Sequence, residues 1–226
     1  APHWAAFLHR PPLCAGQPQQ VHLALAGPSN SVAVSWLTID TTTRSSVMYG
    51  KTTGGSSHDI VEGKSTSYTF SAAGGPAVKG YQQGVYKSGL IHHTVLPTLE
   101  PDTEYWYECG GPNLWSARFT FRSAPEVGRQ SLPYVLGLTG DLGQTNDSNV
   151  NIRHFSEDSS LQSVLHVGDL SYADSQMMRW ESWGRMIEPV AARTPWMVAA
   201  GNHEVEPDSR QTPERPAGDL SIFNTY

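Results

Sequence analysis

The sequence predicts two structural regions, a fibronectin type III-like β-sandwich followed by the beginning of an α/β domain with a parallel sheet. From residue 20 to 123, short apolar segments alternate with clusters of Gly, Pro, Asn and Ser, which is typical of a sandwich. After residue 133, apolar runs alternate with segments of helical periodicity, which is typical of βαβ units. We therefore expect an N-terminal arm at 1–19, the sandwich at 20–123 and the α/β domain at 124–226.

The arm, "APHWAAFLHRPPLCAGQPQ", has no clear periodicity. In the sandwich, Val32, Val34 and Trp36 alternate with small or polar residues, so one face of that strand should be buried. The expected strands lie in seven segments: "VHLALAG", "SVAVSWLT", "SSVMYGK", "STSYTFSA", "LIHHTVLPTL", "EYWYECG" and "WSARFTFRS".

The stretch "LEPDTEYWYEC" places Leu99, Pro101, Thr103 and Tyr105 at alternate positions. This pattern resembles the tyrosine corner of fibronectin type III domains, in which a Tyr hydroxyl ties a strand to the preceding loop. The aromatic residues 105–107 are therefore expected in the core and corner. His92 and His93 are adjacent in a strand and should point to opposite faces, which disfavours a shared metal.

Residues 123–133, "SAPEVGRQSLP", form a plausible linker. Beyond it, the apolar runs 134–140, 163–168 and 196–201 predict three buried parallel strands with right-handed crossovers. The segments 148–160 and 175–192 lie between them and should be helical. In the second, one helical face gathers large apolar residues that should pack on the sheet, namely Met177, Trp180, Trp183 and Ile187.

The composition excludes several classes of function. The chain has 226 residues and a net charge of −6, and it shows no cluster of Lys and Arg, so neither nucleic acid nor a membrane surface is an expected partner. No apolar run is long enough to span a membrane. Two cysteines, Cys14 and Cys109, do not make a disulfide framework, and Cys109 should be buried in a strand. Asn146 begins the sequon Asn-Asp-Ser.

Each apolar run of the second region ends in a polar cluster: "GDLG", "GDLSYAD" and "GNHE". Alone, Gly-Asp is ordinary turn chemistry. Three such clusters in order, however, meet at one edge of a parallel sheet, which is where ligands bind. The candidate residues are Asp141, Asp169, Tyr172, Asn202, His203 and Glu204.

The chemistry of these side chains indicates a metal site. Carboxylate, phenolate and amide oxygens are hard ligands, suited to ferric iron, manganese or zinc. A carboxylate can bridge two cations, and a pair of cations suits the hydrolysis of phosphoryl groups. A nearby His can protonate the leaving oxygen or stabilise charge on the phosphate.

The three clusters resemble the first three of five metal-site motifs in purple acid phosphatases, within the calcineurin-like metallophosphoesterase superfamily. The stretch "SGLIHHTVLPTLEPDTEYWYECGG" is similar to the N-terminal domain of the large plant-type members. Tyr172, three residues after Asp169, separates this family from the wider superfamily. The resemblance implies that 124–226 is the first half of a metallophosphoesterase domain.

The resemblance also implies residue roles. Asp141 would bind a ferric ion, Asp169 would bridge to a second, divalent metal (zinc, manganese or iron), and Tyr172 would bind iron as phenolate. Asn202 would bind the divalent ion and lie near the substrate. His203 would be catalytic and face the phosphate. Glu204 is given only a supporting place at the rim of the site.

The remaining motifs of the family, Val-x-x-His and Gly-His-x-His, are missing, and residues 205–226 contain no His. His154 and His166 lie outside matching motifs, and His166 is expected as a satisfied interior histidine. We therefore expect the chain to be the N-terminal portion of the enzyme, with part of its ligand set, weak metal binding and little activity alone.

The expected function of the whole enzyme is hydrolysis of small phosphate monoesters at acidic pH by a dinuclear metal centre. The resemblance further implies a secreted, extracellular or cell-wall protein and a possible homodimer. Two alternatives stay open. One is another metallophosphoesterase, such as a phosphodiesterase or nucleotidase, and the other is a noncatalytic remnant that acts as a binding module.

Overall fold

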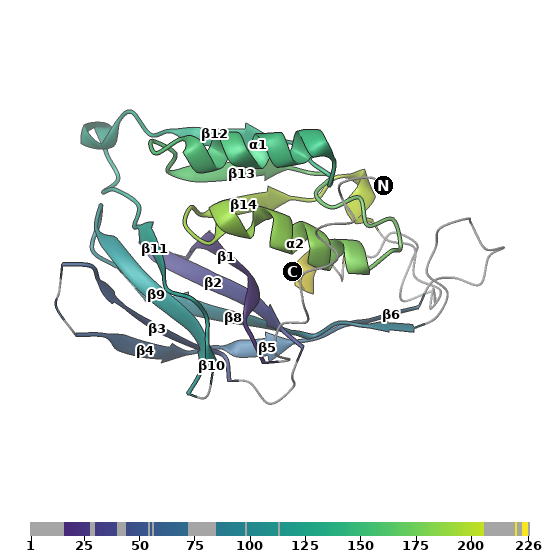
Figure 1. Ribbon diagram of the computed structural model, residues 1–226. Helices are drawn as coiled ribbons and strands as arrows, with labels where there is room; N and C mark the ends of the chain where they lie inside the picture. The colour runs from purple at the N-terminus through teal and green to yellow at the C-terminus, as the bar shows by residue number, and fades with distance from the viewer. Residues whose placement is uncertain are drawn as a thin grey trace.

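The computed structural model describes residues 16–27, 30–39, 44–53, 55, 57–71, 85–97, 99–112, 114–205, 220 and 223–225. These residues form a two-sheet antiparallel sandwich and a parallel α/β region stacked on it (Figure 1). The predicted fold class is confirmed. Most of the predicted arm, residues 1–15, lies outside the described part of the chain.

Two antiparallel sheets make the sandwich. The first has the order β1-β2-β8-β5, with β1 at Gln19–Ala26, β2 at Ser31–Thr38, β8 at Leu90–Leu96 and β5 at Lys64–Thr66. The second has the order β10-β9-β3-β4, with β10 at Leu114–Trp115, β9 at Glu104–Gly111, β3 at Ser46–Lys51 and β4 at Asp59–Glu62. Strand β11, at Phe119–Arg122, also pairs with β9. A separate hairpin joins β6, at Thr69–Ser71, to β7, at Val85–Lys87.

The sandwich core follows the predicted alternation. Val32, Val34 and Trp36 are each at most 1% exposed and pack between the two sheets, which stabilises the fold by removing apolar surface from water. Cys109 is buried in β9 and is a free thiol, as expected. The predicted tyrosine corner is also present, because the Tyr105 hydroxyl accepts a hydrogen bond of 3.0 Å from the Glu100 amide.

His92 and His93 occupy different surroundings on β8. The His92 ring stacks on Trp36 with centroids 4.9 Å apart, and its two nitrogens lie 2.9 Å from the hydroxyls of Thr38 and Ser45. His93 instead contacts the Ser35 hydroxyl at 2.9 Å. The two rings share no hydrogen-bond partner, which agrees with their predicted opposite orientation.

The sandwich has more strands than the seven predicted segments. The segment "STSYTFSA" divides between β5 in the first sheet and β6 in the hairpin. Strand β4 was not predicted. Its other three residues are exposed and only Val61 is partly buried, so the segment has no alternation of apolar and polar residues.

The α/β region contains the three predicted parallel strands, in the order β12-β13-β14. They span Leu136–Thr139, Ser163–Val167 and Trp196–Ala199. Helix α1, at Asn146–Glu157, connects the first two strands, and α2, at Met178–Ala191, connects the last two. Short 3₁₀ turns lie at Arg129–Ser131, Asn202–Glu204 and Phe223–Thr225.

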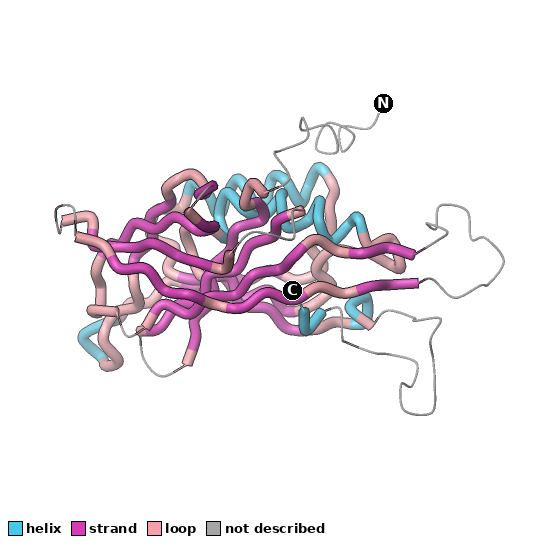
Figure 2. The backbone as a smooth tube through the Cα atoms, turned by 90° about the horizontal axis from the view of Figure 1, so that it is seen from below, coloured by secondary structure: helices cyan, strands magenta, loops and turns pink. Residues whose placement is uncertain are grey.

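Both helices lie on the same side of the three-stranded sheet (Figure 1). As predicted, the apolar face of α2 is buried, with Trp180 at 0% and Ile187 at 3% exposure. This second core also includes Phe70 from the β6–β7 hairpin. The hairpin extends away from the sandwich in Figures 1 and 2, and Tyr86 on it donates a hydrogen bond of 2.5 Å to Glu181 of α2.

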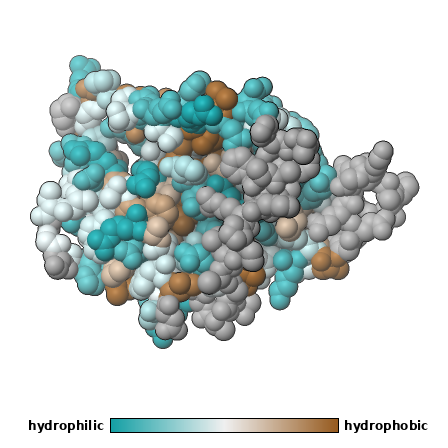
Figure 3. Space-filling model, in the orientation of Figure 1, coloured by the Kyte–Doolittle hydropathy of each residue, from teal (hydrophilic) through white to brown (hydrophobic). Residues whose placement is uncertain are grey.

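Polar contacts join the sandwich to α2. The Tyr107 hydroxyl donates a buried hydrogen bond of 2.7 Å to the Ala192 carbonyl, and Glu188 accepts one of 3.1 Å from the Val21 amide. In Figure 3 the hydrophobic residues on the described surface form separate patches among hydrophilic ones. Within the described ranges, no helix is both long and apolar enough to cross a membrane.

Candidate metal centre

The three polar clusters lie at the carboxyl ends of β12, β13 and β14. Gly168 and Gly201 bring two of these ends into close contact, because a Cβ atom on Gly168 would lie 2.9 Å from the Gly201 Cα. A Cβ atom on Gly201 would lie 2.3 Å from Asp169 Oδ1. Only glycine fits this approach, which explains why the second and third clusters begin with that residue.

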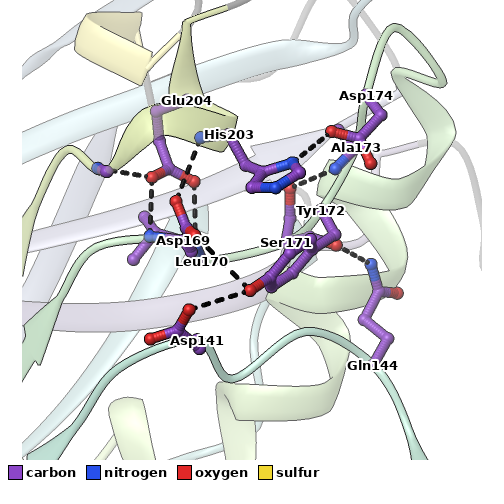
Figure 4. A network of polar contacts seen from close by, with 11 residues as sticks. Asp141, Gln144, Asp169, Leu170, Ser171, Tyr172, Ala173, Asp174, His203 and Glu204 are labelled. Carbon is purple, nitrogen blue, oxygen red and sulfur yellow. Dashed lines mark hydrogen bonds and ion pairs between the residues drawn. The ribbon is translucent and has the colours of Figure 1, made fainter.

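Tyr172 connects the first two clusters (Figure 4). Its hydroxyl donates to Asp141 Oδ1 at 3.1 Å and lies 3.4 Å from Asp169 Oδ2. The three side chains predicted from separate strand ends therefore converge. The partial burial of Tyr172 and the hydrogen bond to Asp141 raise the pKa of its phenol to about 12, so the phenol is protonated here and acts as donor.

The backbone at these residues is strained. Asp141, Asp169 and Tyr172 have φ values of 51°, 51° and 49°, in the left-handed region, and Asp174 has 47°. For an aromatic residue this conformation is an outlier, and each such residue costs on the order of 1–3 kcal/mol. Strain of this kind gathers at functional sites, where the surrounding contacts hold it in place.

Asn202 and His203 lie on the 3₁₀ turn after β14. The His203 amide donates to Asp169 Oδ1 at 3.0 Å. The centroid of the His203 imidazole ring lies 4.3 Å from that of the Tyr172 ring. Asn202 is exposed at the start of the same turn. The turn thus places the third cluster directly beside the second.

Asp174 was not assigned from the sequence, although it lies within "GDLSYAD". Its Oδ1 is 2.6 Å from His203 Nδ1. This hydrogen bond is the main reason why the pKa of His203 is raised above its ordinary value, and the negative charge of Asp174 adds to the effect. The signal in the sequence was an acidic residue five positions after Asp169, but the sequence does not show which ring it faces.

Glu204 is not at the rim of the site, and that prediction is wrong. Its side chain is 0% exposed and accepts hydrogen bonds from the backbone amides of Asp169, Leu170 and Gly201 at 2.7–2.8 Å (Figure 4). The physical reason is the close approach of the two strand ends, which turns three backbone N–H groups toward one point and requires a buried acceptor there.

His166 is buried as expected, at 1% exposure. Within the described residues its ring nitrogens form no hydrogen bond of good geometry, and the Asp169 backbone is the polar group that interacts with the ring. The ring lies 5.8 Å from Trp183 and 5.9 Å from Trp196, and burial lowers its pKa to about 4. His154 is exposed on α1.

The donor set of this site is oxygen-rich. Among the described residues, no three His, Cys, Asp or Glu side chains gather as a metal-binding group on their own. No ion pair within the described ranges joins a Lys or Arg to Asp141 or Asp169. Two carboxylates that share a phenol donor without a basic partner form a negative site whose oxygens fit a hard cation.

Comparisons with known proteins agree with this arrangement. Residues 18–123 match the family described as purple acid phosphatase, N-terminal domain, and residues 134–225 match the family described as calcineurin-like phosphoesterase. The chain belongs to the purple acid phosphatase family. The membership predicted from the three strand-end clusters and Tyr172 is thereby confirmed.

Two curated plant relatives and one solved structure illustrate the similarity. A purple acid phosphatase of Glycine max is 42% identical over 195 residues, covering 83% of this chain and 38% of the relative. The Fe(3+)-Zn(2+) purple acid phosphatase 12 of Arabidopsis thaliana is 39% identical, covering 84% of this chain and 38% of the relative.

The structure of purple acid phosphatase PPD1 from yellow lupin superposes with a TM-score of 0.72 at 23% identity, covering 93% of this chain and 40% of that one. This likeness supports the fold. The chain thus spans about two fifths of the length of the relatives it matches.

Proposed function

We propose that residues 134–205 supply the first part of a dinuclear metal centre that hydrolyses small phosphate monoesters. In this proposal Asp141, Asp169, Tyr172 and Asn202 donate oxygen ligands, and Asp169 bridges the two cations. The observation that carries the proposal is the convergence of Asp141 and Asp169, from two separate strand ends, on the Tyr172 hydroxyl, which lies 3.1 Å from one carboxylate and 3.4 Å from the other.

The residues fit the cations that the family implies, iron with a second divalent metal. Carboxylate and phenol oxygens are hard donors, and the Tyr172 hydroxyl lies within 3.4 Å of both carboxylates, so these three groups would hold a cation that offsets the negative charge of the carboxylates. When bound, such a pair of cations polarises the phosphate and lowers the pKa of a water molecule that serves as nucleophile.

His203 takes the role of a phosphate-facing donor in this proposal. Asp174 fixes one ring nitrogen, Nδ1, through the hydrogen bond of 2.6 Å, which leaves Nε2 for the substrate. Because the pKa of His203 is raised, the imidazolium form persists to higher pH than in a free histidine. A positively charged donor at this position would stabilise phosphate oxygens or protonate a leaving alkoxide.

The proposal is tested by titrating the 226-residue chain with Fe³⁺ and recording its visible spectrum. We expect a tyrosinate-to-iron absorption band that is absent in Tyr172→Phe and retained in Tyr134→Phe, a matched variant at a phenol that instead contacts Ser163. A band of equal strength in Tyr172→Phe, or no iron binding at all, would contradict the proposed centre and favour a noncatalytic binding module.

Activity offers a second test. We propose that this chain turns over p-nitrophenyl phosphate poorly, because the imidazole ligands implied by the missing motifs are not in its sequence. Normal turnover with two firmly bound metals would show that the residues present suffice. Faster hydrolysis of a phosphodiester than of the monoester would favour the phosphodiesterase alternative.

The cellular setting belongs to the same proposal. We infer a secreted glycoprotein without nucleic-acid or membrane partners, which forms a homodimer in its full-length form. Asn146 is exposed at the start of α1, whereas the Ser148 hydroxyl of its sequon is hydrogen-bonded in the helix cap to Thr145. Glycosylation should therefore precede folding of α1, and mass spectrometry of protein from a secretory host tests it.

A further inference from the structure

The buried carboxylate of Glu204 binds the backbone of two loops. The inference drawn from these contacts rests on the proposed metal function. Glu204 Oε2 accepts from the Asp169 amide at 2.8 Å and from the Gly201 amide at 2.7 Å, while Oε1 accepts from the Leu170 amide at 2.8 Å. One side chain therefore satisfies backbone donors from the loop after β13 and from the loop after β14.

The loop after β13 also supplies a carboxylate that accepts a backbone hydrogen bond from the loop after β14. Asp169 Oδ1 accepts from the His203 amide at 3.0 Å, so each loop supplies a carboxylate to the backbone of the other. Figure 4 shows these bonds lying side by side, to the left of the His203 ring. The exchange fixes the distance and orientation between the turn that carries Asn202 and the loop that carries Asp169.

The hydrogen bonds of Glu204 also hold the strained backbone of Asp169 in place. Its φ of 51° is unfavourable for a residue with a side chain, and such a conformation persists only when surrounding contacts determine it. Glu204 holds the amide of Asp169 and the amide of the next residue, Leu170, so it restrains the strained residue on both of its peptide planes.

We propose that Glu204 is a positioning residue for the metal centre. It does not touch substrate or cation. Its three hydrogen bonds hold Asp169 in the left-handed conformation and lock the two strand-end loops together, so that Asp169, Asn202 and His203 face the same point. Residues that orient metal ligands in this way change metal affinity by about 10–100-fold when they are replaced.

The test compares Glu204→Gln with Glu188→Gln in the 226-residue chain. Glutamine keeps the shape of Glu204 but presents an NH₂ group to an amide that needs an acceptor, so at least one of the three bonds is lost. Glu188 is the matched control, because it also accepts a backbone amide, that of Val21, but at the contact between α2 and β1.

Two readouts are measured by NMR on the same samples. The first is amide hydrogen exchange in the absence of metal, where we expect Asp169, Leu170 and Gly201 to exchange at least about tenfold faster in Glu204→Gln than in Glu188→Gln. The second is a Zn²⁺ titration followed through the resonances of residues 169–172 and 202–203, where Glu204→Gln should raise the Kd for Zn²⁺ by about 10-fold or more and Glu188→Gln should not.

The outcomes separate this inference from the proposed function. If exchange rises uniformly along the chain, or if the Kd for Zn²⁺ is unchanged in Glu204→Gln, Glu204 is a structural residue only and the inference is wrong. If the wild-type chain shows no Zn²⁺-dependent shifts at these residues, the proposed metal centre fails. The metal-dependent role of Glu204 then fails with it, and the exchange data report only on the loop contact.

The variant must also fold. If Glu204→Gln is unfolded, hydrogen exchange in the wild-type chain still tests the inference. The amides of Asp169, Leu170 and Gly201 should be strongly protected from exchange although they lie outside the strands. Exchange of these three amides as fast as that of the exposed Val205 would overturn the inference. Glu204→Asp, with a carboxylate one methylene shorter, supplies an intermediate case for the Zn²⁺ titration.

Discussion

The sandwich and the α/β region each bury a histidine among aromatic rings, but they treat it differently. In the sandwich, both nitrogens of His92 have hydroxyl partners at 2.9 Å and the ring stacks on Trp36. In the α/β region, His166 lies between two Trp rings, and its nitrogens form no hydrogen bond of good geometry in the described part of the chain. The sandwich thus gives its buried histidine two local hydroxyl partners.

The backbone shows the same contrast. In the sandwich, the described non-glycine residues with positive φ are scattered at Gln20, Asn30 and Asp102. In the α/β region they gather within one site, at Asp141, Asp169, Tyr172, Asp174 and Ser175. The comparison teaches that the sandwich is organised for stability, whereas the parallel sheet carries strain so that its strand ends can converge.

The strongest way to break this comparison is to remove the core of one region. Trp180→Ala should lower the free energy of unfolding by about 3–5 kcal/mol, because the side chain is fully buried against the sheet. Since Phe70 reaches into that core and Tyr107 bonds to Ala192, we expect both regions to unfold together. Urea unfolding followed by far-UV circular dichroism and by Trp fluorescence should give coincident transitions. Two separate transitions would show that the regions are independent.

The two histidines give the next test. His92→Phe should cost about 2–3 kcal/mol at pH 7, because the buried hydroxyls of Thr38 and Ser45 both lose their hydrogen bond to the ring. His166→Phe should change the unfolding free energy by less than about 1 kcal/mol, because the ring has no hydrogen bond of good geometry to lose among the described residues. Urea denaturation of both variants measures the difference. Equal costs would show that His166 has an essential contact.

The buried His92 should also make the unfolding free energy depend on pH. Burial, with the nearby His93 charge, lowers the pKa of His92 to about 4 in the folded state, below the ordinary value of 6.5 in the unfolded chain. Between these two values the unfolded state binds more protons, so the unfolding free energy falls as the pH falls. We expect His92 to account for about 3 kcal/mol of this loss between pH 7 and pH 4. The measurement is the difference between wild type and His92→Phe in urea denaturation at pH 7 and pH 4, and an unchanged pH dependence in the variant would contradict it.

The smallest expected effect concerns strain. Asp141→Gly should be more stable than Asp141→Ala by about 1 kcal/mol, because glycine adopts the φ of 51° without steric cost. At Asp147, in the first turn of α1, the order should be reversed, since glycine weakens a helix. Thermal unfolding of the four variants tests this. The same order at both positions would mean that the backbone at Asp141 relaxes.

The sequence was sufficient for features that are local and periodic. Alternation at Val32, Val34 and Trp36 predicted a buried face, and the spacing before Tyr105 predicted the corner. Three strands followed by polar clusters predicted that Asp141, Asp169 and Tyr172 would meet, because parallel strands share one edge.

What the sequence did not predict depends on where backbone groups point in space. Glu204 was placed at the rim because its identity does not reveal that three amides from two loops face it. Asp174 is one of several acidic residues near the site, and only the fold selects it as the partner of His203. Short strands such as β4 are not predicted, because a single inward-facing residue does not produce a periodic pattern in the sequence.

The reciprocal carboxylates of Asp169 and Glu204 have an evolutionary consequence. Because each loop relies on an acceptor from the other and on glycine at positions 168 and 201, neither loop can be reshaped alone. Among related sequences we expect these four positions to be kept as a set or lost as a set. New specificity should therefore arise in segments outside this pair, and a chain that has lost one of the four residues should have lost its need for the site.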